Sequence, residues 1–325
     1  MSRQGTDLAG PVLDGVDVAG VSALVRQVAA SVVRPRFRDL HTGDVSEKGP
    51  GDLVTVVDLE AEAALTAGLR LLTPDVPVVG EEAVAADPAL VRTVATAERV
   101  WVVDPIDGTQ AFVDGAPDYA VMVALAERGE AVAAWICLPE LDRLYVAVRG
   151  GGAWLDDAPL VRAPADLSAL RGGAATRFLP TGRPSGAGDG PGVGPDGTPA
   201  DDPADRPVDL PGDVPVDVPV DVLGDVRARV EAGIAGLGPG ATTSDRLWSG
   251  ATYARIASGD LDFAFYWRTN PWDHLVGAVL LRELGGVSRR PDGADYRAGD
   301  DGVGLVVASS PAVGDAVVTA LRPRG

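Results

Sequence analysis

Apolar residues recur along this chain first at helical spacing and later at strand spacing. Between residues 21 and 33 they fall three and four positions apart, which predicts an amphipathic helix. Apolar runs and alternations predict strands at 76–80, 100–103, 119–127, 131–138, 143–148, 261–267 and 303–309. Helical spacing and capping residues predict further helices at 58–72, 249–258, 270–284 and 312–321, and we expect ordered structure to resume at about 226–237. Helices and strands are therefore mixed along the whole chain.

The strand predicted at 100–103 leads into the stretch Asp104-Pro-Ile-Asp-Gly-Thr109. Proline has no backbone N–H group, so we expect the strand to end at Asp104 and Pro105. Asp104 and Asp107 then stand beside the backbone N–H groups of Gly108 and Thr109, which suits a divalent cation bridged to a phosphate. Taken singly, each aspartate could instead start a turn or cap the next helix.

Four other acids follow predicted strands or begin predicted helices. Asp58 opens a helix, where it could be a simple N-cap. Glu81 and Glu82 follow Gly80, which we expect to let the backbone bend so that the Glu81 carboxylate turns toward neighbouring strand ends. Paired glutamates are also common in solvated turns. Asp273 lies in the first turn of a helix, where it could merely complement the helix dipole.

Composition narrows the classes of function. A net charge of −19 disfavours binding to a nucleic-acid backbone. A single cysteine and two histidines argue against a disulfide framework, a thiolate zinc site and a histidine-based catalytic triad. No apolar run approaches the length of about 18 residues that a membrane span needs, and the N-terminus has no signal-peptide pattern. We therefore expect a cytoplasmic protein without membrane or nucleic-acid partners.

One segment differs from the rest of the chain. Residues 181–224 are dominated by Gly, Pro and Asp, which predicts a disordered acidic insertion or, as the alternative, an acidic arm that binds a partner. We expect residues 1–19 to form a flexible leader. Residues 20–325 would then form one domain in two lobes, at about 20–170 and about 226–325.

Three motifs together resemble the inositol monophosphatase family. They are Asp-Leu-Val-Thr-Val-Val-Asp at 52–58, the string at 104–109, and Trp-Asp at 272–273 followed by Glu-Leu-Gly-Gly at 283–286. Gln110 stands where the family usually has Asn. The resemblance implies a layered α/β fold, an αβαβα sandwich of the inositol monophosphatase and sugar phosphatase type. It also implies hydrolysis of a small phosphorylated metabolite, most directly an inositol monophosphate, by an Mg²⁺-activated water. Homodimers are usual in this family, so we expect that assembly as well.

The resemblance also implies a role for each candidate residue. An all-oxygen ligand set favours Mg²⁺ over zinc, and two or three ions are expected. By resemblance, the first ion is bound by Glu81, Asp104 and the backbone carbonyl of Ile106, and the second by Asp104, Asp107 and Asp273. Catalysis is assigned to Glu81, Thr109 and Asp58, and phosphate binding to the amides of Gly108 and Thr109.

The substrate is less closely specified by these motifs. Tyr266 stands seven residues before Asp273, where inositol phosphatases commonly have glutamate, and the segment 246–252 also departs from the usual pattern. Asp107, Asp273, Tyr266 and Arg268 are the expected substrate contacts. Arg268 could meet a second anionic group, or it could be a solvated residue at a strand end.

Other functions stay open. Histidinol phosphate, fructose 1,6-bisphosphate and adenosine 3′,5′-bisphosphate are alternative substrates for the same chemistry. A second class is an inactive regulator that binds metal or phosphate. A third is a scaffold that acts through the segment 181–224.

Overall fold

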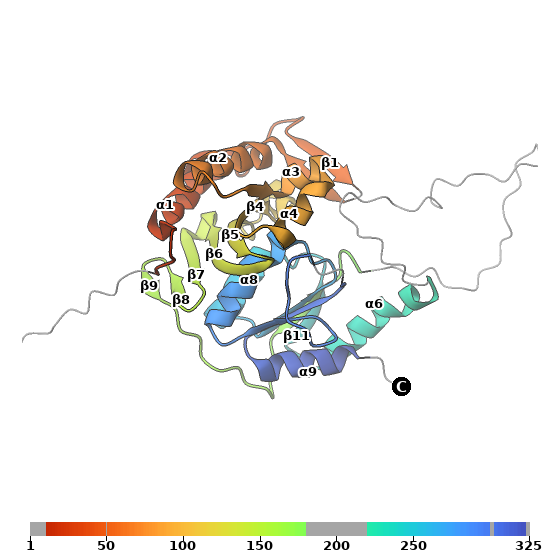
Figure 1. The fold of residues 1–325 in the computed structure, drawn as a ribbon. Coiled ribbons are helices and arrows are strands. Elements are labelled where there is room, and N and C mark those ends of the chain that lie inside the picture. Colours follow the sequence, from red (N-terminus) through yellow and green to blue (C-terminus); the bar gives the residue numbers. More distant parts are fainter. Residues whose placement is uncertain (1–10, 50, 180–219, 300–301, 323–325) are drawn as a thin grey trace, which may run out of the picture.

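The computed structural model describes residues 11–49, 51–179, 220–299 and 302–322, with the backbone alone at 220–225. The first ten residues of the expected leader and residues 181–219 of the expected insertion lie outside this part. Helices and sheets alternate in five layers (Figure 1), from α1 and α2 through a first sheet, α7 and α8, and a second sheet to α6 and α9. This arrangement confirms the predicted layered αβαβα sandwich.

The first sheet has seven strands in chain order, and only the first pair is parallel. Its strands are β3 (Val78–Gly80), β4 (Val100–Asp107), β5 (Ala120–Glu127), β6 (Glu130–Leu138), β7 (Arg143–Val148), β8 (Gly152–Leu155) and β9 (Ala158–Pro159). Strands β5 and β6, which correspond to the strands predicted at 119–127 and 131–138, form a hairpin that turns at Arg128 and Gly129, both with positive φ. Because β3 and β4 run in the same direction, the residues that follow them emerge at the same edge of the sheet.

The second sheet has five strands in the order β11-β10-β12-β14-β13. These strands are β10 (Gly172–Ala175), β11 (Ala241–Ser244), β12 (Phe263–Tyr266), β13 (Val287–Arg289) and β14 (Leu305–Ala308). A separate antiparallel pair consists of β1 (Val45–Gly49) and β2 (Asp52–Thr55). This pair precedes α2, the helix that carries Asp58.

The helices cover both faces of the two sheets. The α-helices are α1 (Val18–Val28), α2 (Val56–Leu72), α3 (Glu81–Ala86), α4 (Val91–Thr96), α5 (Thr109–Val113), α6 (Val220–Ala235), α7 (Ser249–Ser258), α8 (Pro271–Glu283) and α9 (Pro311–Leu321). Shorter helical turns are η1 (Ala29–Val33), η2 (Arg34–Arg36), η3 (Pro88–Leu90) and η4 (Pro139–Leu141). In the described part of the chain, no helix is both long and apolar enough to cross a membrane.

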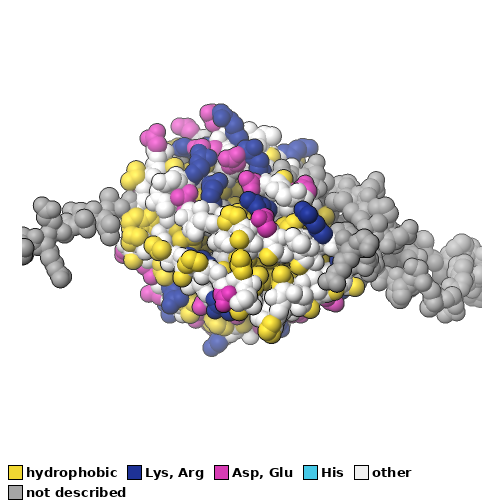
Figure 2. Space-filling view, turned by 90° about the horizontal axis from the view of Figure 1, so that it is seen from below, with side chains coloured by type: hydrophobic (Ala, Val, Ile, Leu, Met, Phe, Trp, Pro, Cys, Tyr) yellow, Lys and Arg dark blue, Asp and Glu magenta, His cyan; other side chains and the backbone are white. Residues whose placement is uncertain are grey.

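Alternation along the strands produces the layering. In β4, Val100 and Val102 pack toward α7 and α8, whereas Trp101 and Val103 pack toward α1 and α2. In β12, Ala264 and Tyr266 face α8, and Phe263 and Phe265 face α6 and α9. Successive side chains of a strand point to opposite faces, so an apolar run buried on both sides is the expected result. On the outer face seen in Figure 2, basic and acidic side chains are intermixed.

Three boundaries differ from the sequence-based expectation. The first helix begins at Val18, inside the expected leader, and α6 begins at Val220, inside the last part of the expected insertion. The expectation that β4 ends at Asp104-Pro105 is wrong, because the strand continues to Asp107. Its pairing with β5 shifts register between Asp104 and Asp107, where a bulge accommodates Pro105 without a ladder hydrogen bond.

Candidate active site

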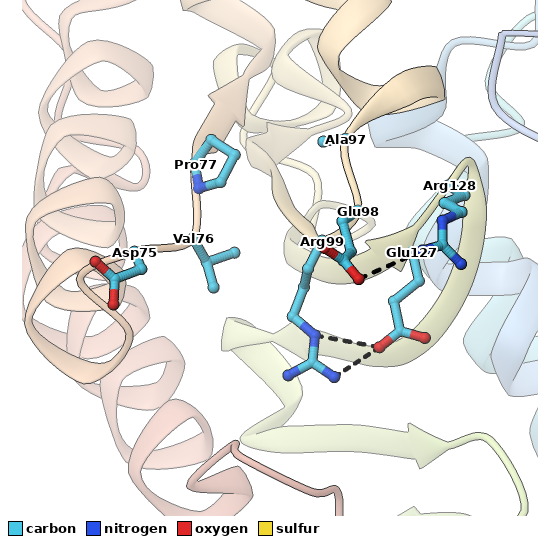
Figure 3. A pocket seen from close by; sticks show the side chains of 8 residues that line it. All are labelled: Asp75, Val76, Pro77, Ala97, Glu98, Arg99, Glu127 and Arg128. Atoms are coloured by element: carbon cyan, nitrogen blue, oxygen red, sulfur yellow. Dashed lines mark hydrogen bonds and ion pairs between the residues drawn. The ribbon is translucent and has the colours of Figure 1, made fainter.

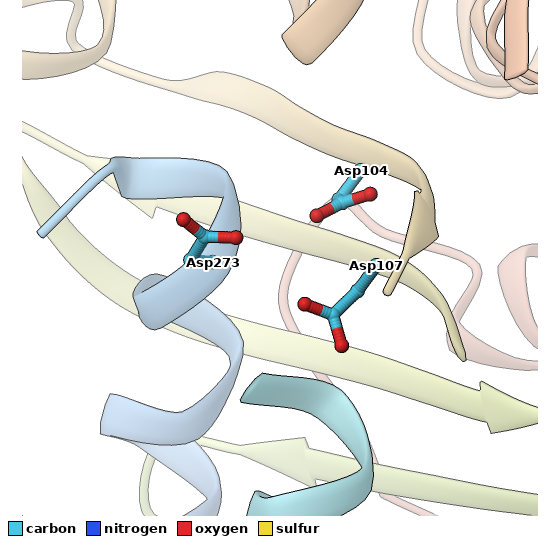
Figure 4. A group of neighbouring side chains, drawn as sticks. All are labelled: Asp104, Asp107 and Asp273. Carbon is cyan, nitrogen blue, oxygen red and sulfur yellow. The ribbon is translucent and has the colours of Figure 1, made fainter. Parts of the chain in front are cut away.

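The bulge in β4 brings two predicted metal ligands onto one face of the sheet. In a regular strand, residues three positions apart point to opposite faces. Asp104 pairs with Met122 and Asp107 with Ala120, so β4 has one more residue than β5 in this interval. The extra residue turns both carboxylates toward α7 and α8. Asp273, from the first turn of α8, meets them there (Figure 4).

These three aspartates form a compact group, in which Asp104 and Asp107 are buried and Asp273 is half-buried. Each offers one oxygen, and the three oxygens lie within 4.8 Å of one another. Burial, together with the neighbouring carboxylates, raises the pKa of Asp104 and of Asp273 well above the usual range. The Oδ1 atom of Asp104 is buried and has no hydrogen-bond partner among the described residues. Hard oxygen donors at this spacing fit a divalent cation such as Mg²⁺.

Glu81 lies beside this group but is not one of its three members. Its side chain is 19% exposed, and its Oε1 accepts a hydrogen bond of 2.7 Å from Lys48 Nζ. The same ammonium group donates to Glu82 Oε1 at 2.9 Å. Burial alone would lower the pKa of Lys48, but the charges of Glu81 and Glu82 outweigh it and raise that pKa. The charge of Glu81 also raises the pKa of Asp104, so the two carboxylates are electrostatic neighbours.

The chain turns at Gly80 as expected, since β3 ends there and α3 begins at Glu81, but this turn does not require the conformational freedom of glycine. Gly80 has an extended backbone with φ −105°, which any residue could adopt. A glycine is needed here because an added Cβ atom would lie 2.1 Å from the Glu62 carboxyl carbon. Space, and not backbone conformation, therefore explains this glycine.

Asp58 and Thr109, which the resemblance assigns to catalysis, are hydrogen-bonded to each other, although Asp58 is not the N-cap of α2. Thr55 is the N-cap, and Asp58 is the third helical residue of a capping box in which its Oδ2 accepts from the Thr55 amide at 2.8 Å. Its other oxygen accepts a 3.1 Å hydrogen bond from Thr109 Oγ1, which also lies 3.1 Å from the carbonyl oxygen of Ile106. Burial raises the pKa of Asp58 to about 6. Asp58 thus combines a structural bond with a contact to the predicted catalytic threonine.

Gly108 makes the turn from β4 into α5. Its φ of +82° lies in the left-handed region, and an added Cβ would lie 3.0 Å from Trp248 and 3.1 Å from the carbonyl oxygen of Asp118. Both conformation and space therefore require glycine. The turn places the Gly108 and Thr109 amides directly after the aspartates, as the predicted phosphate contacts require.

Three contacts that support the site were not found from the sequence. Ser249 Oγ donates to Asp107 Oδ1 at 2.8 Å, and the Gly250 amide donates to Asp107 Oδ2 at 2.8 Å. The N-terminus of α7 thereby holds Asp107 in place, and burial still raises the pKa of this carboxylate to about 6. A serine at the start of a predicted helix was the available signal. Similarly, Asn270 makes no capping bond and donates to Asp273 Oδ2 at 3.1 Å.

A cavity opens from the aspartates toward two arginines. Its lining includes Asp107, Asp273, Tyr266 and Arg268. The Arg268 guanidinium lies 3.9 Å from the ring centroid of Phe178, and within the described part of the chain it forms no hydrogen bond or ion pair. Arg177 also lines the cavity, with its guanidinium 5.1 Å from the centroid of the Trp248 ring and 5.3 Å from that of Phe178. The cavity therefore offers positive charge and aromatic surface beside the acids.

A second cavity, of about 510 Å³, lies at the opposite end of β3 and β4 (Figure 3). Arg99 donates to Glu127 at 2.6 Å, and Arg128 donates to Glu98 at 3.3 Å. The arginines that line this cavity are paired with its glutamates. They differ in this respect from Arg268, so the larger cavity offers no unpaired guanidinium to an anionic ligand.

Comparisons with known proteins agree with this geometry. The sequence pattern of the inositol monophosphatase family matches residues 16–180 and 227–323. An inositol-1-monophosphatase of Rhizobium meliloti is 40% identical over 38% of this chain, and the 3′(2′),5′-bisphosphate nucleotidase CysQ of Escherichia coli K12 is 35% identical over 35%. Each match spans 44% of the relative's own length. The crystal structure of the extragenic suppressor protein suhB from Bartonella henselae has the same fold, with a TM-score of 0.68, 21% identity, and coverage of 94% of this chain and 97% of that one.

Proposed function

The chain belongs to the inositol monophosphatase family, and on this premise we propose that it hydrolyses a phosphomonoester with the aid of bound Mg²⁺. One observation carries the proposal. Asp104, Asp107 and Asp273 present oxygens within 4.8 Å of one another, the first two from buried positions and the third from a half-buried one, and no described lysine or arginine forms an ion pair with them. A buried group of like charges needs a compensating cation. Two or three Mg²⁺ ions would be held by these aspartates with Glu81 and the Ile106 carbonyl.

Bound Mg²⁺ would lower the pKa of a coordinated water and stabilise the charge on the leaving oxygen. The protein residues bind and orient the reactants around it. Thr109 donates to Asp58, which leaves the lone pairs of its hydroxyl oxygen to accept a hydrogen bond from a water in the site. Glu81 and Asp58 are the carboxylates that would take up the proton that this water releases when it attacks phosphorus. The amides of Gly108 and Thr109 would bind phosphate oxygens.

Two substrate classes have support. The Rhizobium relative is named an inositol-1-monophosphatase, which supports an inositol monophosphate. Arg268 favours a phosphomonoester with a second anionic group, because its guanidinium lies in the same cavity as Asp107 and Asp273, has no ion-pair partner among the described residues, and can bind an anion. The CysQ relative is named for a bisphosphate nucleotide.

Phosphate release from a panel of substrates tests the proposal. The panel contains inositol 1-phosphate, fructose 1,6-bisphosphate, adenosine 3′,5′-bisphosphate and histidinol phosphate, each with Mg²⁺ and with EDTA. We expect Mg²⁺-dependent release from at least one substrate. Absence of release from all four, in a protein that retains its fold, would contradict the proposed activity.

Arg268→Met separates the two substrate classes. Loss of a charge-assisted contact should raise KM for a bisphosphate substrate about 10- to 100-fold and change that for inositol 1-phosphate less than about twofold. The control is Arg227→Met, which removes a surface arginine that pairs with Glu231 on α6. Equal losses on both substrates would contradict a second anion site at Arg268.

A further inference from the structure

Glu62 is an acid that the proposed chemistry does not use. It lies against the first turn of α3, the turn that begins with Glu81. It belongs to α2, four residues after Asp58, and it is 8% exposed. Its Oε2 accepts from the Glu82 amide at 2.8 Å, and its Oε1 accepts from the Ala83 amide at 2.9 Å. These amides belong to the first turn of α3, which has no side-chain cap of its own. Glu62 therefore caps α3 from a neighbouring helix.

Gly80 makes room for this contact. The three atoms nearest to a Cβ added at Gly80 would be Cδ, Oε2 and Oε1 of Glu62, at 2.1, 2.3 and 2.5 Å. Real Cβ atoms do not approach other atoms so closely. Because the backbone of Gly80 is extended, the Glu62 carboxylate is the reason that a side chain cannot be placed there.

We propose that Glu62 is a positioning residue that fixes Glu81 relative to Asp58 and the aspartates. Both of its carboxylate oxygens are bonded to amides of the turn that begins with Glu81. The helix that carries Glu62 also carries Asp58, so one rigid element sets the separation of Asp58 and Glu81. Glu62 touches neither Lys48 nor the three aspartates through a hydrogen bond, and it acts through the backbone of α3.

The first experiment measures thermal unfolding in EDTA and does not depend on the proposed function. Gly80→Ala should lower Tm by about 5 °C or more, because the methyl group and the carboxylate cannot both be accommodated. Glu62→Ala should also lower Tm, because it leaves the buried Glu82 amide and the partly buried Ala83 amide without this partner. In the double variant the methyl group meets no carboxylate, so its Tm should equal that of Glu62→Ala alone. Additive losses would overturn the inference.

The second experiment separates positioning from simple stabilisation. It follows Mn²⁺ binding by electron paramagnetic resonance, with Mn²⁺ as the probe for the site. Glu62→Gln keeps the size of the side chain but turns an NH₂ group toward one of the two amides. This displacement of Glu81 should weaken Mn²⁺ binding about tenfold, as changes behind a metal ligand commonly do. Glu60→Gln, on the exposed side of the same helix, is the matched control and should bind as the wild type does.

The outcomes of the two experiments are distinct. Wild-type Mn²⁺ affinity in Glu62→Gln would reduce Glu62 to a stabilising residue and overturn the proposal. This second experiment rests on the proposed function. A wild-type protein that binds no Mn²⁺ would contradict that function, and the thermal unfolding of the Gly80 and Glu62 variants would then decide the inference alone.

Discussion

Two groups of acids lie next to each other at the same edge of the first sheet, and they are stabilised differently. The glutamate group, Glu62, Glu81 and Glu82, contains a resident cation, since Lys48 pairs with two members and backbone amides pair with the third. The aspartate group, Asp104, Asp107 and Asp273, has amide and hydroxyl donors, but no described lysine or arginine is paired with it. Lys48 is the only lysine of the chain. This difference indicates that the aspartate group, and not the glutamate group, needs an external cation.

Among the variants proposed for the two groups, Asp104→Asn should cause the largest loss of activity. It also tests most directly the difference between the glutamate group and the aspartate group. Loss of a metal ligand should reduce turnover by about 10³-fold or more, since metal stabilisation of transition-state charge is worth several kcal/mol. Without metal, the same change removes a buried carboxylate that has an unpaired oxygen. The variant should therefore be at least as stable as the wild type in EDTA at pH 8.

Phosphate release and thermal unfolding measure these two effects. Asp157→Asn, at an exposed position in the turn between β8 and β9, is the control and should change neither quantity. Substantial turnover in Asp104→Asn would contradict its role as a shared ligand. A large loss of stability in EDTA would mean that the carboxylate is already compensated without metal.

The sequence predicts most of the fold because its signals are local. Strand β7 and helix α7 have the predicted bounds, and the acids at positions 104, 107 and 273 converge as expected. The bulge in β4 is not predictable in this way, because proline alone indicated a strand end. The contacts of Ser249 with Asp107, across 142 residues, and of Glu62 with Gly80 depend on tertiary packing. No local pattern encodes them.

The next largest effect should be on the pH dependence of the free energy of unfolding of the metal-free protein. Burial raises the pKa of Asp104 and Asp273, and that of Asp107 to about 6 from an ordinary 3.8. Between these values the folded state binds more protons than the unfolded state, so the free energy of unfolding contributed by this group falls as pH rises. Acids whose pKa is lowered in the folded state change the free energy of unfolding with pH in the opposite direction. The measurement is therefore the difference between wild type and Asp104→Asn in urea unfolding from pH 4 to 8.

We expect the wild type to lose stability relative to Asp104→Asn as pH rises in EDTA. Saturating Mg²⁺ should remove or reverse this trend, because the cation binds the charged carboxylates. A difference that does not vary with pH in EDTA would show that the aspartate group carries no electrostatic strain. The contrast between the two acid groups would then fail.

Lys48→Met tests the role of the lysine in the glutamate group. Breaking a largely buried ion pair leaves Glu81 and Glu82 without their cation, and should lower the free energy of unfolding in EDTA by about 3 kcal/mol. Mg²⁺ should recover part of the loss, since Glu81 can then bind metal. The control is Arg128→Met, whose pair with Glu98 is 75% and 88% exposed and should contribute less than about 1 kcal/mol. Equal losses from the two variants would contradict the resident-cation role.

Ser249→Ala should give the smallest effect, and it distinguishes fixed donors from cations in the aspartate group. The variant loses the 2.8 Å hydrogen bond to Asp107 Oδ1, while the Gly250 amide still holds Oδ2. The free energy of unfolding should fall by about 1 kcal/mol. Because Asp107 is then less well oriented, the Mg²⁺ concentration for half-maximal phosphate release should rise about tenfold. Ser31→Ala, which removes an exposed hydroxyl bonded to the Gln27 carbonyl, should change neither quantity. Unaltered Mg²⁺ dependence in Ser249→Ala would mean that the bulge in β4 alone, without α7, holds Asp107 in place.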